Sequence, residues 1–504
     1  RGANGVIMIT TKKAKTGTTT ITVRQQITLS QFSSKLDLWR DPVLMASLNN
    51  ESRTNGGFAP LYVGEVSSTG IYYPSIEELQ TTWKTNTRWD DLVFRDTPIS
   101  NNTTATISSS NEKTVFNLSA NYYTDKGMYI KDEYRKGGYN FSIDHNVFDN
   151  FKVKFSNILS YGNRNNNGGL AYWRNPIFPV YDENGDYYLT NANDFSHPIA
   201  ITEHKLNKTK SLDVISSAAL EWQILPYLKL TSQLNYKYGT YVTDEYQPKK
   251  YTEGGQFNNG LASINNWLSH SVVSETFANF QKQFGKHDVG AMLGYSYEYY
   301  LSRESKLISK DFVNESLGNE SMSSGNPEKN EVSNGYTKTR LVSGMLRLNY
   351  AYNNKYLLTL TGRTDGSSKF GKNNKWAMFP SGALSWKAHE ESFVKNWNVF
   401  DELKFRVSYG ISGNQGISPY QTLSRYGTGN DGSWVTSIGP GYVSGWTGPG
   451  WIYRVWSGIP NPDLKWETTG QLDFGIDMAF FNRRLRFTFD YYDKQTRDLL
   501  RERN

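Results

Sequence analysis

The sequence predicts an all-β fold, a transmembrane antiparallel β-barrel, from three observations. Amphipathic strands of roughly ten residues recur along almost the whole chain, with polar and apolar side chains alternating. The connections between these strands are alternately tight and long. Aromatic residues make up 14% of the 504 residues, which suits aromatic girdles at two membrane interfaces. One strand face would therefore meet the lipid bilayer, and the other would meet a polar lumen.

Composition excludes several other classes of protein. The mean hydropathy is −0.63, and no run reaches the roughly 18 apolar residues that a transmembrane helix requires. The chain has no cysteine, which excludes disulfide scaffolds and thiolate metal sites. The net charge of +7 is spread over 55 basic and 48 acidic residues, and the longest basic cluster, Lys12 to Lys15, is too short to indicate nucleic acid.

The alternation can be followed from strand to strand in chain order. Phe405, Val407 and Tyr409, for example, fall on one face, with Arg406 and Ser408 on the other. A soluble sandwich has the same period of two, so alternation alone does not decide between the two folds. The clearest alternating segments are 116–122, 228–237, 340–350, 356–363, 404–412, 472–478 and 486–491.

Connection lengths favour the barrel over the sandwich. A sandwich has no reason to place a long loop at every second connection, whereas a barrel sends all its long loops to the extracellular side. We count about fifteen strands. Tight turns are expected at 111–112, 148–151, 225–227, 285–287, 353–354 and 481–483, and long loops near 31–100, 162–205, 241–268, 302–336 and 415–463. Two connections depart from this scheme, a short loop at 365–375 and a long turn with room for a short helix at 387–401.

The ends of the chain suggest an internal fragment of a longer protein. The chain opens on Arg1 without a visible signal peptide, and it stops at Asn504 just after an amphipathic strand. An open strand edge in lipid leaves backbone groups unpaired, at several kcal/mol for each. We therefore expect further strands beyond this sequence.

Several segments carry a family resemblance. Residues 1–13 are similar to the end of a plug domain, and the segments that follow match a barrel signature in the right order. The chain resembles the SusC/RagA-type TonB-dependent outer-membrane transporters of Bacteroidetes over essentially its full length. The signature segments are Arg347–Tyr350, Asn354–Leu358, Arg363–Gly371, Phe379–Ser381, Leu403–Arg406, Ser408–Gly410, Gly413–Gln415, Asn461–Glu467 and Tyr491–Leu500, together with Trp386.

This resemblance implies a 22-stranded barrel in the outer membrane with an N-terminal plug, driven by TonB and paired with a surface SusD-like lipoprotein. Residues 1–15 would be the C-terminal end of the plug domain, and residues 16–504 a barrel that is incomplete at its C-terminus. TonB would act through a region missing here. The imported substrate would be a glycan-derived oligosaccharide or a peptide.

The N-terminal residues form a candidate plug–barrel joint. Gly2 and Gly5 permit backbone conformations closed to other residues, and Val6 to Thr10 are suited to a β-strand. The joint would transmit TonB pulling from plug to barrel, or it would be only a packed turn and strand. The residues assigned to it are Arg1, Gly2, Asn4 and Gly5.

Aromatic residues in the long loops are the candidates for substrate or partner contact. Such side chains stack on sugar rings, anchor a partner lipoprotein, or pack the loops against each other, and the sequence leaves these three roles open. The candidates are Trp173, Arg174, Trp434, Trp446, Trp451, Tyr453 and Trp456.

Polar residues on the strands form the second set of candidates. Lumen-facing side chains would contact the plug or line the channel, and we assign Lys404, Arg406, Asp473, Asp477, Arg486 and Asp490 to this set. Asp365-Gly366 is a strong turn signal at the barrel rim, where Arg363 and Asp365 could pair inside the lumen. Residues 182–186 predict a hairpin turn within a loop, with a calcium site as the alternative.

Catalytic and metal-binding patterns are missing from the sequence. The six histidines are scattered without metal-ligand spacing, and no glycine-rich phosphate loop precedes a Lys-Ser or Lys-Thr pair. We therefore predict no enzyme activity, no metal and no cofactor. Two alternatives remain. One is a passive porin or a structural or adhesive surface barrel. The similarity of the N-terminal residues to a plug domain argues against an unplugged pore. The other is a secreted β-rich carbohydrate-binding protein or glycan hydrolase.

Overall fold

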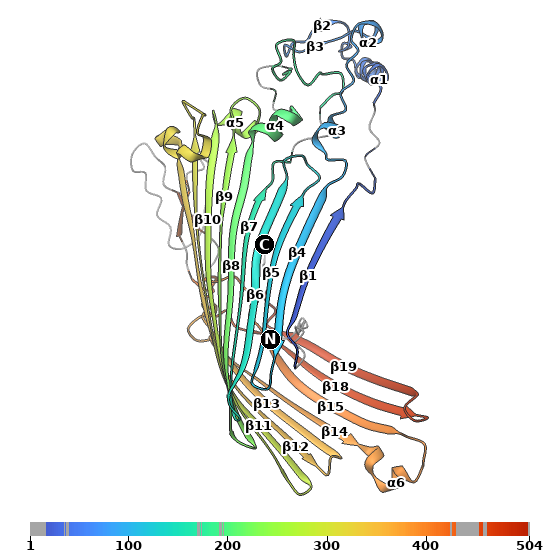
Figure 1. The fold of residues 1–504 in the computed structure, drawn as a ribbon, viewed down its shortest axis with the longest axis vertical. Helices are drawn as coiled ribbons and strands as arrows, with labels where there is room; N and C mark the ends of the chain where they lie inside the picture. Colours follow the sequence, from blue (N-terminus) through green and yellow to red (C-terminus); the bar gives the residue numbers. More distant parts are fainter. Residues whose placement is uncertain are drawn as a thin grey trace.

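The computed structural model describes residues 17–34, 36, 40–168, 172, 174–190, 194, 196–423, 426–429, 453–456 and 461–501. Its main feature is one 15-stranded sheet that curves strongly along its width (Figure 1). Neighbouring strands are antiparallel and follow the chain in the order β1-β4-β5-β6-β7-β8-β9-β10-β11-β12-β13-β14-β15-β18-β19. The predicted all-β barrel fold and the count of about fifteen strands are confirmed.

The strands of the main sheet are joined by simple up-and-down connections. They are β1 Thr20–Leu29, β4 Ile99–Ser110, β5 Thr114–Lys126, β6 Glu133–Phe148, β7 Phe151–Asn165, β8 Leu206–Leu225, β9 Leu228–Gln247, β10 Leu261–Phe284, β11 His287–Lys310, β12 Glu331–Tyr352, β13 Tyr356–Ser367, β14 Trp376–Lys387, β15 Glu402–Asn414, β18 Glu467–Phe480 and β19 Leu485–Arg497. Two small hairpins lie outside this sheet, β2 Glu65–Val66 with β3 Tyr72–Tyr73, and β16 Tyr426–Gly429 with β17 Tyr453–Trp456.

Several strands are longer than the roughly ten residues that the alternation predicted. Strands β10 and β11 have 24 residues each, which is roughly 80 Å of extended chain. A membrane crossing needs only about 9–11 residues. Beyond Leu301 the face of β11 that carries Leu293 and Tyr295 turns polar, with Arg303 and Ser305. Alternation therefore identifies only the part of a strand that has an apolar face, and the strand continues past it.

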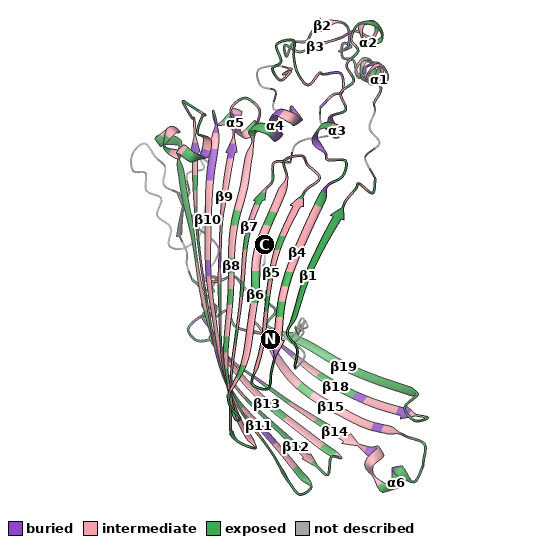
Figure 2. Ribbon diagram, viewed as in Figure 1, coloured by how far each residue is buried: buried purple, intermediate pink, exposed green. Residues whose placement is uncertain are grey.

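The register keeps apolar residues on one face across several strands. Leu358 pairs with Leu384, Leu384 with Val407, and Val407 with Phe474. Leu384, Val407 and Phe474 are 56%, 41% and 40% exposed, so no protein layer covers them. Figure 2 shows few buried residues along the strands. A soluble sandwich would cover this face, whereas a barrel wall leaves it to hydrocarbon.

Tight turns and long loops separate to opposite ends of the sheet, as predicted. Asn353 and Asn354 form a tight turn with φ of 49° and 55°, the left-handed conformation that suits a two-residue hairpin. The long connections hold α1 Pro42–Asn55, α2 Ile76–Thr81, α3 Trp89–Val93, α4 Pro198–His204, α5 Glu253–Phe257, η1 Gly318–Ser324 and η2 Pro327–Lys329, and the α-helices among them gather at one end (Figure 1). The 387–401 connection at the other end contains η3 Ala388–Glu390 and α6 Ser392–Lys395, so the expected short helix is present.

Three local predictions are wrong. The connections expected at 241–268 and 302–336 cover only residues 248–260 and 311–330, because strands β9 to β12 extend beyond their alternating parts. Asp365 and Gly366 do not form a turn, since both lie in β13, where Asp365 pairs with Ser343 and Ala377. Hydrogen bonding to strands on both sides overrides the local turn preference. The turn comes later, in residues 368–375.

Within the described ranges, no helix has the length and apolar character needed to span a membrane.

Candidate functional site

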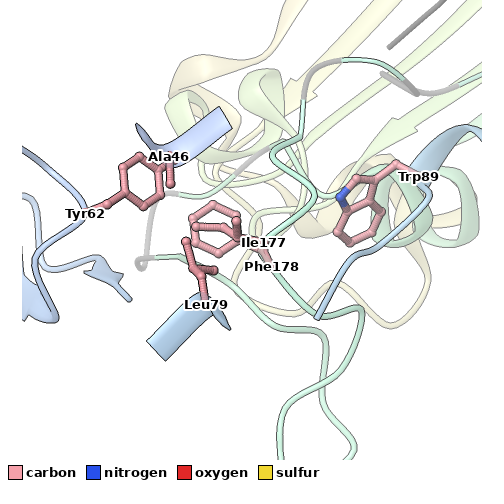
Figure 3. Packing of buried hydrophobic residues seen from close by; sticks show 6 residues of the cluster. All are labelled: Ala46, Tyr62, Leu79, Trp89, Ile177 and Phe178. Atoms are coloured by element: carbon pink, nitrogen blue, oxygen red, sulfur yellow. The ribbon is translucent and has the colours of Figure 1, made fainter. Parts of the chain in front are cut away.

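A packed layer of loops covers the end of the sheet where the long connections gather. We call residues 40–98, together with the described residues of 174–204, the loop cap. Figure 3 shows Ile177 and Phe178 of the β7–β8 connection among side chains of the β1–β4 connection. The buried core of the loop cap consists of Ala46, Tyr62, Leu79, Trp89, Ile177 and Phe178. Two connections that are far apart in the sequence thus share one hydrophobic core.

Local sequence signals position the helices of the loop cap. Asp41 caps α1 by accepting hydrogen bonds from the backbone N–H groups of Val43 and Leu44, with Pro42 at the first helical position. Ser75 and Glu78 form a reciprocal capping box at the start of α2. These caps fix the helix ends, so that Ala46 and Leu79 project into the shared core.

Hydrogen bonds between the two connections reinforce this core. The indole Nε1 of Trp83 donates to the carbonyl of Ile177 at 2.8 Å, and that of Trp89 donates to the carbonyl of Asn175 at 3.1 Å. The Asn175 amide nitrogen donates to the Tyr62 hydroxyl at 2.7 Å. Each bond satisfies a polar group next to a buried apolar surface, where an unpaired group would cost about 1–3 kcal/mol.

Arg174 is buried within the loop cap, with 5% of its surface exposed. Its Nη1 donates to Asp194 Oδ2 at 2.6 Å and to Ser196 Oγ at 3.0 Å. Its guanidinium lies 5.3 Å from the ring centre of Trp89 and 5.5 Å from that of Phe178. This geometry favours loop packing over direct ligand contact as the role of Arg174.

Two titratable groups beside Arg174 have shifted pKa values. Burial raises the pKa of Asp194, but hydrogen bonds from Ser196 and Thr190 and the charge of Arg174 outweigh it and hold the pKa well below its usual range. Burial lowers the pKa of His197 to about 4. His197 Nδ1 accepts from the backbone N–H of Ala200, so the Nε2 beside the carbonyl of Val180 carries the proton of the neutral ring.

Most of the other predicted loop candidates lie outside the described residues. This holds for Trp173, Trp434, Trp446 and Trp451. Tyr453 and Trp456 begin and end β17, whose backbone pairs with β16. The proposed joint residues Arg1, Gly2, Asn4 and Gly5, with the whole predicted plug segment 1–15, also lie outside the described residues.

The predicted lumen-facing residues share one face of β15, β18 and β19. Alternation and register place them opposite the apolar face that contains Val407 and Phe474, the six being Lys404, Arg406, Asp473, Asp477, Arg486 and Asp490. Arg406 Nε donates to Asp477 Oδ2 at 2.8 Å, and its Nη2 donates to Asp490 Oδ1 at 2.9 Å. Lys404 Nζ lies 3.9 Å from Asp477 Oδ2. The arrangement is a charged network across three strands.

The signature segments pack against one another at the loop end of β13 and β14. The ring centre of Trp466 lies 5.0 Å from that of Phe370 and 5.5 Å from that of Phe379. Its Nε1 donates to the carbonyl of Lys375 at 3.1 Å. Leu341 completes this buried cluster. Motifs separated by about a hundred residues therefore meet in one aromatic core, which sequence reasoning missed because nothing local indicates their partners.

Two smaller predictions of contacts are confirmed. Arg363 Nε donates to both carboxylate oxygens of Asp365, at 2.9 and 2.8 Å, and Arg363 Nη2 donates to Ser343 Oγ at 2.9 Å. The predicted hairpin at 182–186 is closed by a bridge between Tyr181 and Tyr187. In the part of the chain that the structure describes, no group of three or more His, Asp or Glu is placed to hold a metal ion.

A curved antiparallel sheet with an exposed apolar face, tight turns at one end and packed loops at the other defines the wall of an outer-membrane β-barrel. The chain belongs to the TonB dependent receptor-like, beta-barrel family, whose model matches residues 202–503. Proteins of this family are receptors and transporters of the outer membrane, not enzymes.

Comparisons with individual proteins agree with this assignment. The chain is 27% identical over 518 residues to TonB-dependent receptor P3 of Formosa agariphila, with 99% of this chain and 47% of that protein covered. It is 26% identical over 536 residues to TonB-dependent receptor SusC of Bacteroides thetaiotaomicron, with 99% and 49% covered. The solved structure of the RagAB peptide transporter superposes with a TM-score of 0.75 at 20% identity, covering 99% of this chain and 58% of that chain. The chain thus spans about half the length of these TonB-dependent receptors.

Proposed function

We propose that this chain forms the barrel wall and the recognition loops of a TonB-energised nutrient importer of the SusC/RagA type. Substrate would bind among the loops at the extracellular end, TonB would displace the plug, and the substrate would pass along the charged lumen face. Membership of the receptor family, together with the sorting of the sheet into an apolar and a charged face, is the observation that supports this proposal most strongly.

The proposal includes a SusD-like surface lipoprotein as partner and an oligosaccharide or a peptide as substrate. SusC is the name of one relative, and the RagAB structure is described as a peptide transporter. The loop cap would be a rigid surface on which such a partner could dock, because its two connections share a buried core and several hydrogen bonds between them. The similarity to SusC and to RagAB does not decide whether the substrate is an oligosaccharide or a peptide.

The experiment is an uptake assay with the full-length protein that contains this chain, expressed in a strain that lacks the chromosomal copy. Fluorescent oligosaccharides and fluorescent peptides of matched mass are offered separately, with and without dissipation of the inner-membrane proton gradient. We expect uptake of one class only, with at least a tenfold loss when the gradient is dissipated. Uptake that continues without the gradient would instead support a passive porin.

A second arm tests the loop candidates Trp446 and Trp451. The double Trp→Ala variant is expected to lower substrate uptake or co-purification of the lipoprotein at least fivefold, and the affected measurement identifies the role. Trp222→Ala is the matched control, because Trp222 is exposed at the tight-turn end of β8, away from the loops. If neither measurement changes, packing of the loop is the remaining role for this pair.

A further inference from the structure

A short segment at the tight-turn end lies on the outside of the barrel wall. Residues 388–400 connect β14 to β15 and contain η3 and α6. Ala388 and Val394 in this segment are buried against Leu403, with Trp386 and Phe405 packed around them. Leu403 and Phe405 alternate with Lys404 and share a face with Val407. The segment therefore covers the apolar face of the sheet and not its charged face.

The outer surface of this segment is itself apolar. Phe393, Trp397 and Val399 are 53%, 56% and 54% exposed. Phe400 fastens the end of the segment to the sheet, with its ring centre 5.1 Å from that of Phe480. Exposed Trp and Phe on a short amphipathic segment suit the boundary between lipid head groups and acyl chains. Because tight turns lie on the periplasmic side of such barrels, this boundary belongs to the inner leaflet.

A groove of about 560 Å³ runs across the apolar face next to this segment. Trp386 and Phe405 contribute both to the groove and to the cluster under the segment. The rest of its lining comes from strands β12 to β15 and β18, and its exposed surface is almost entirely apolar. It includes Tyr350, Leu358, Leu384, Val407 and Phe474, while Ser385 and Arg406 add little polar surface. The groove is continuous with the apolar face that would meet hydrocarbon, so its lining suits an apolar chain.

A cluster of polar groups lies beside the groove. Tyr356 lines the groove, and its hydroxyl donates to Glu391 Oε1 at 2.7 Å. Lys355 Nζ donates to Glu391 Oε2 at 2.9 Å. A cation, a hydroxyl and a carboxylate therefore meet where the sheet and the covering segment join. A head group that carries both a phosphate and an ammonium matches this arrangement of charges.

We propose that the groove and residues 388–400 form a binding site for a zwitterionic glycerophospholipid of the inner leaflet. One acyl chain lies along Leu358, Leu384 and Val407. The phosphate contacts Lys355, and the ammonium contacts Glu391. The site would hold the barrel at a fixed depth in the bilayer. This lipid site requires that the chain lies in the outer membrane, but it does not require that the protein transports any particular substrate.

The test is photolabelling of the full-length protein in vesicles that contain a trace of phosphatidylethanolamine with a diazirine on one acyl chain. Labelled peptides are mapped by mass spectrometry. We expect peptides that contain residues 356–358, 384–386 and 405–407 to be labelled at least fivefold more than peptides of other lipid-facing strands. The double variant Leu384→Trp with Val407→Phe fills the groove with apolar volume and should abolish this excess.

Leu293→Trp is the matched control, because Leu293 is 65% exposed on the apolar face of β11 and does not line the groove. It should leave the excess labelling intact, with heat-modifiable migration showing that each variant is folded. Uniform labelling of all lipid-facing strands in the unmodified protein would overturn the proposal, and that measurement needs no variant. Equal labelling by diazirine phosphatidylglycerol would overturn the head-group assignment.

Discussion

At the scale of the residue, Arg174 shows how burial decides the role of a charged side chain. Its position beside Trp173 in a long loop suggested contact with a ligand or partner. The structure surrounds its guanidinium with Asp194, Ser196 and two aromatic rings. Removing this buried charge would leave the buried carboxylate of Asp194 without a cationic partner, with only its hydrogen bonds from Thr190 and Ser196.

Replacing Arg174 by Met is therefore expected to destabilise the loop cap by about 3–5 kcal/mol, because the carboxylate of Asp194 would remain buried without its partner. Hydrogen exchange of the backbone amides in residues 174–190 measures the change as lost protection. Arg88→Met is the control, since the Arg88–Asp91 pair is exposed and worth at most about 1 kcal/mol. Equal protection in both variants would contradict the proposed role.

His197 gives the loop cap a pH dependence. The pKa of His197 is about 4 in the folded cap against 6.5 for the free side chain, so folding favours the neutral ring. The stabilisation is complete above pH 6.5 and is lost as the pH falls toward 4, by about 2 kcal/mol at pH 5 and about 3 kcal/mol at pH 4. Asp194, whose pKa is also lowered, adds a loss only at still lower pH.

Limited proteolysis of the loop cap between pH 7 and pH 5 should show this loss. The His197→Gln variant keeps a donor toward Val180 and an acceptor toward Ala200 without titrating, so its cap should show a much weaker pH dependence. If the His197→Gln variant lost stability at low pH as strongly as the original protein, a group other than His197 would be responsible for the pH dependence.

At the scale of the element, glycine positions decide which signature segments can approach each other. A Cβ atom on Gly371 would lie 1.9 Å from the carbonyl oxygen of Pro462, so the 368–375 turn and the segment before β18 touch backbone to backbone. This contact seats Trp466 against Phe370. Both segments, Arg363–Gly371 and Asn461–Glu467, belong to the family signature in the sequence, but only the fold shows that they pack together.

Gly371→Ala is expected to destabilise the barrel by about 1–3 kcal/mol, because the carbonyl of Pro462 must move away from the added methyl group. The temperature at which the folded electrophoretic band converts to the unfolded band measures this change. Gly362→Ala is the matched control within β13, where a Cβ atom would meet nothing within 4 Å. A similar loss in both variants would show that the replacement of glycine by alanine as such, rather than the close contact with Pro462, is responsible.

At the scale of the whole molecule, the sheet sorts its side chains between hydrocarbon and water. The sorting continues through strands β13, β14, β15 and β18, where the register aligns Leu358, Leu384, Val407 and Phe474. The charged network of Arg406 lies on the opposite face. This division gives the family assignment its physical meaning, because only a membrane barrel leaves so many apolar strand residues without protein neighbours.

Val407→Arg in the full-length protein should cost about 2–4 kcal/mol and strongly reduce the folded fraction in the outer membrane, because the charge would face hydrocarbon. Ser408→Arg is the control one residue away. It faces the charged side, where Asp473 lies across the strand pair, and it should be tolerated. Equal folded fractions by heat-modifiable migration would contradict this assignment of the two faces, and a larger loss for Ser408→Arg would reverse it.

The sequence by itself determined the barrel class, the approximate number of strands, the two faces and the ends at which turns and loops lie. These features depend on a period of two and on connection length, which are local and repeat many times. It also indicated the Arg363–Asp365 pair and the 182–186 hairpin, since their residues are neighbours in the chain.

Only the tertiary structure decided which distant segments meet. The loop cap core, the burial of Arg174, the Trp466 cluster and the covering segment 388–400 each join residues from separate connections or strands. The strand ends also had to come from the structure. The alternation of polar and apolar side chains stops where a strand leaves the bilayer, whereas the hydrogen bonds between neighbouring strands continue beyond that point. Contacts of this kind depend on the closing of long loops in three dimensions, for which no local pattern of residues provides a signal.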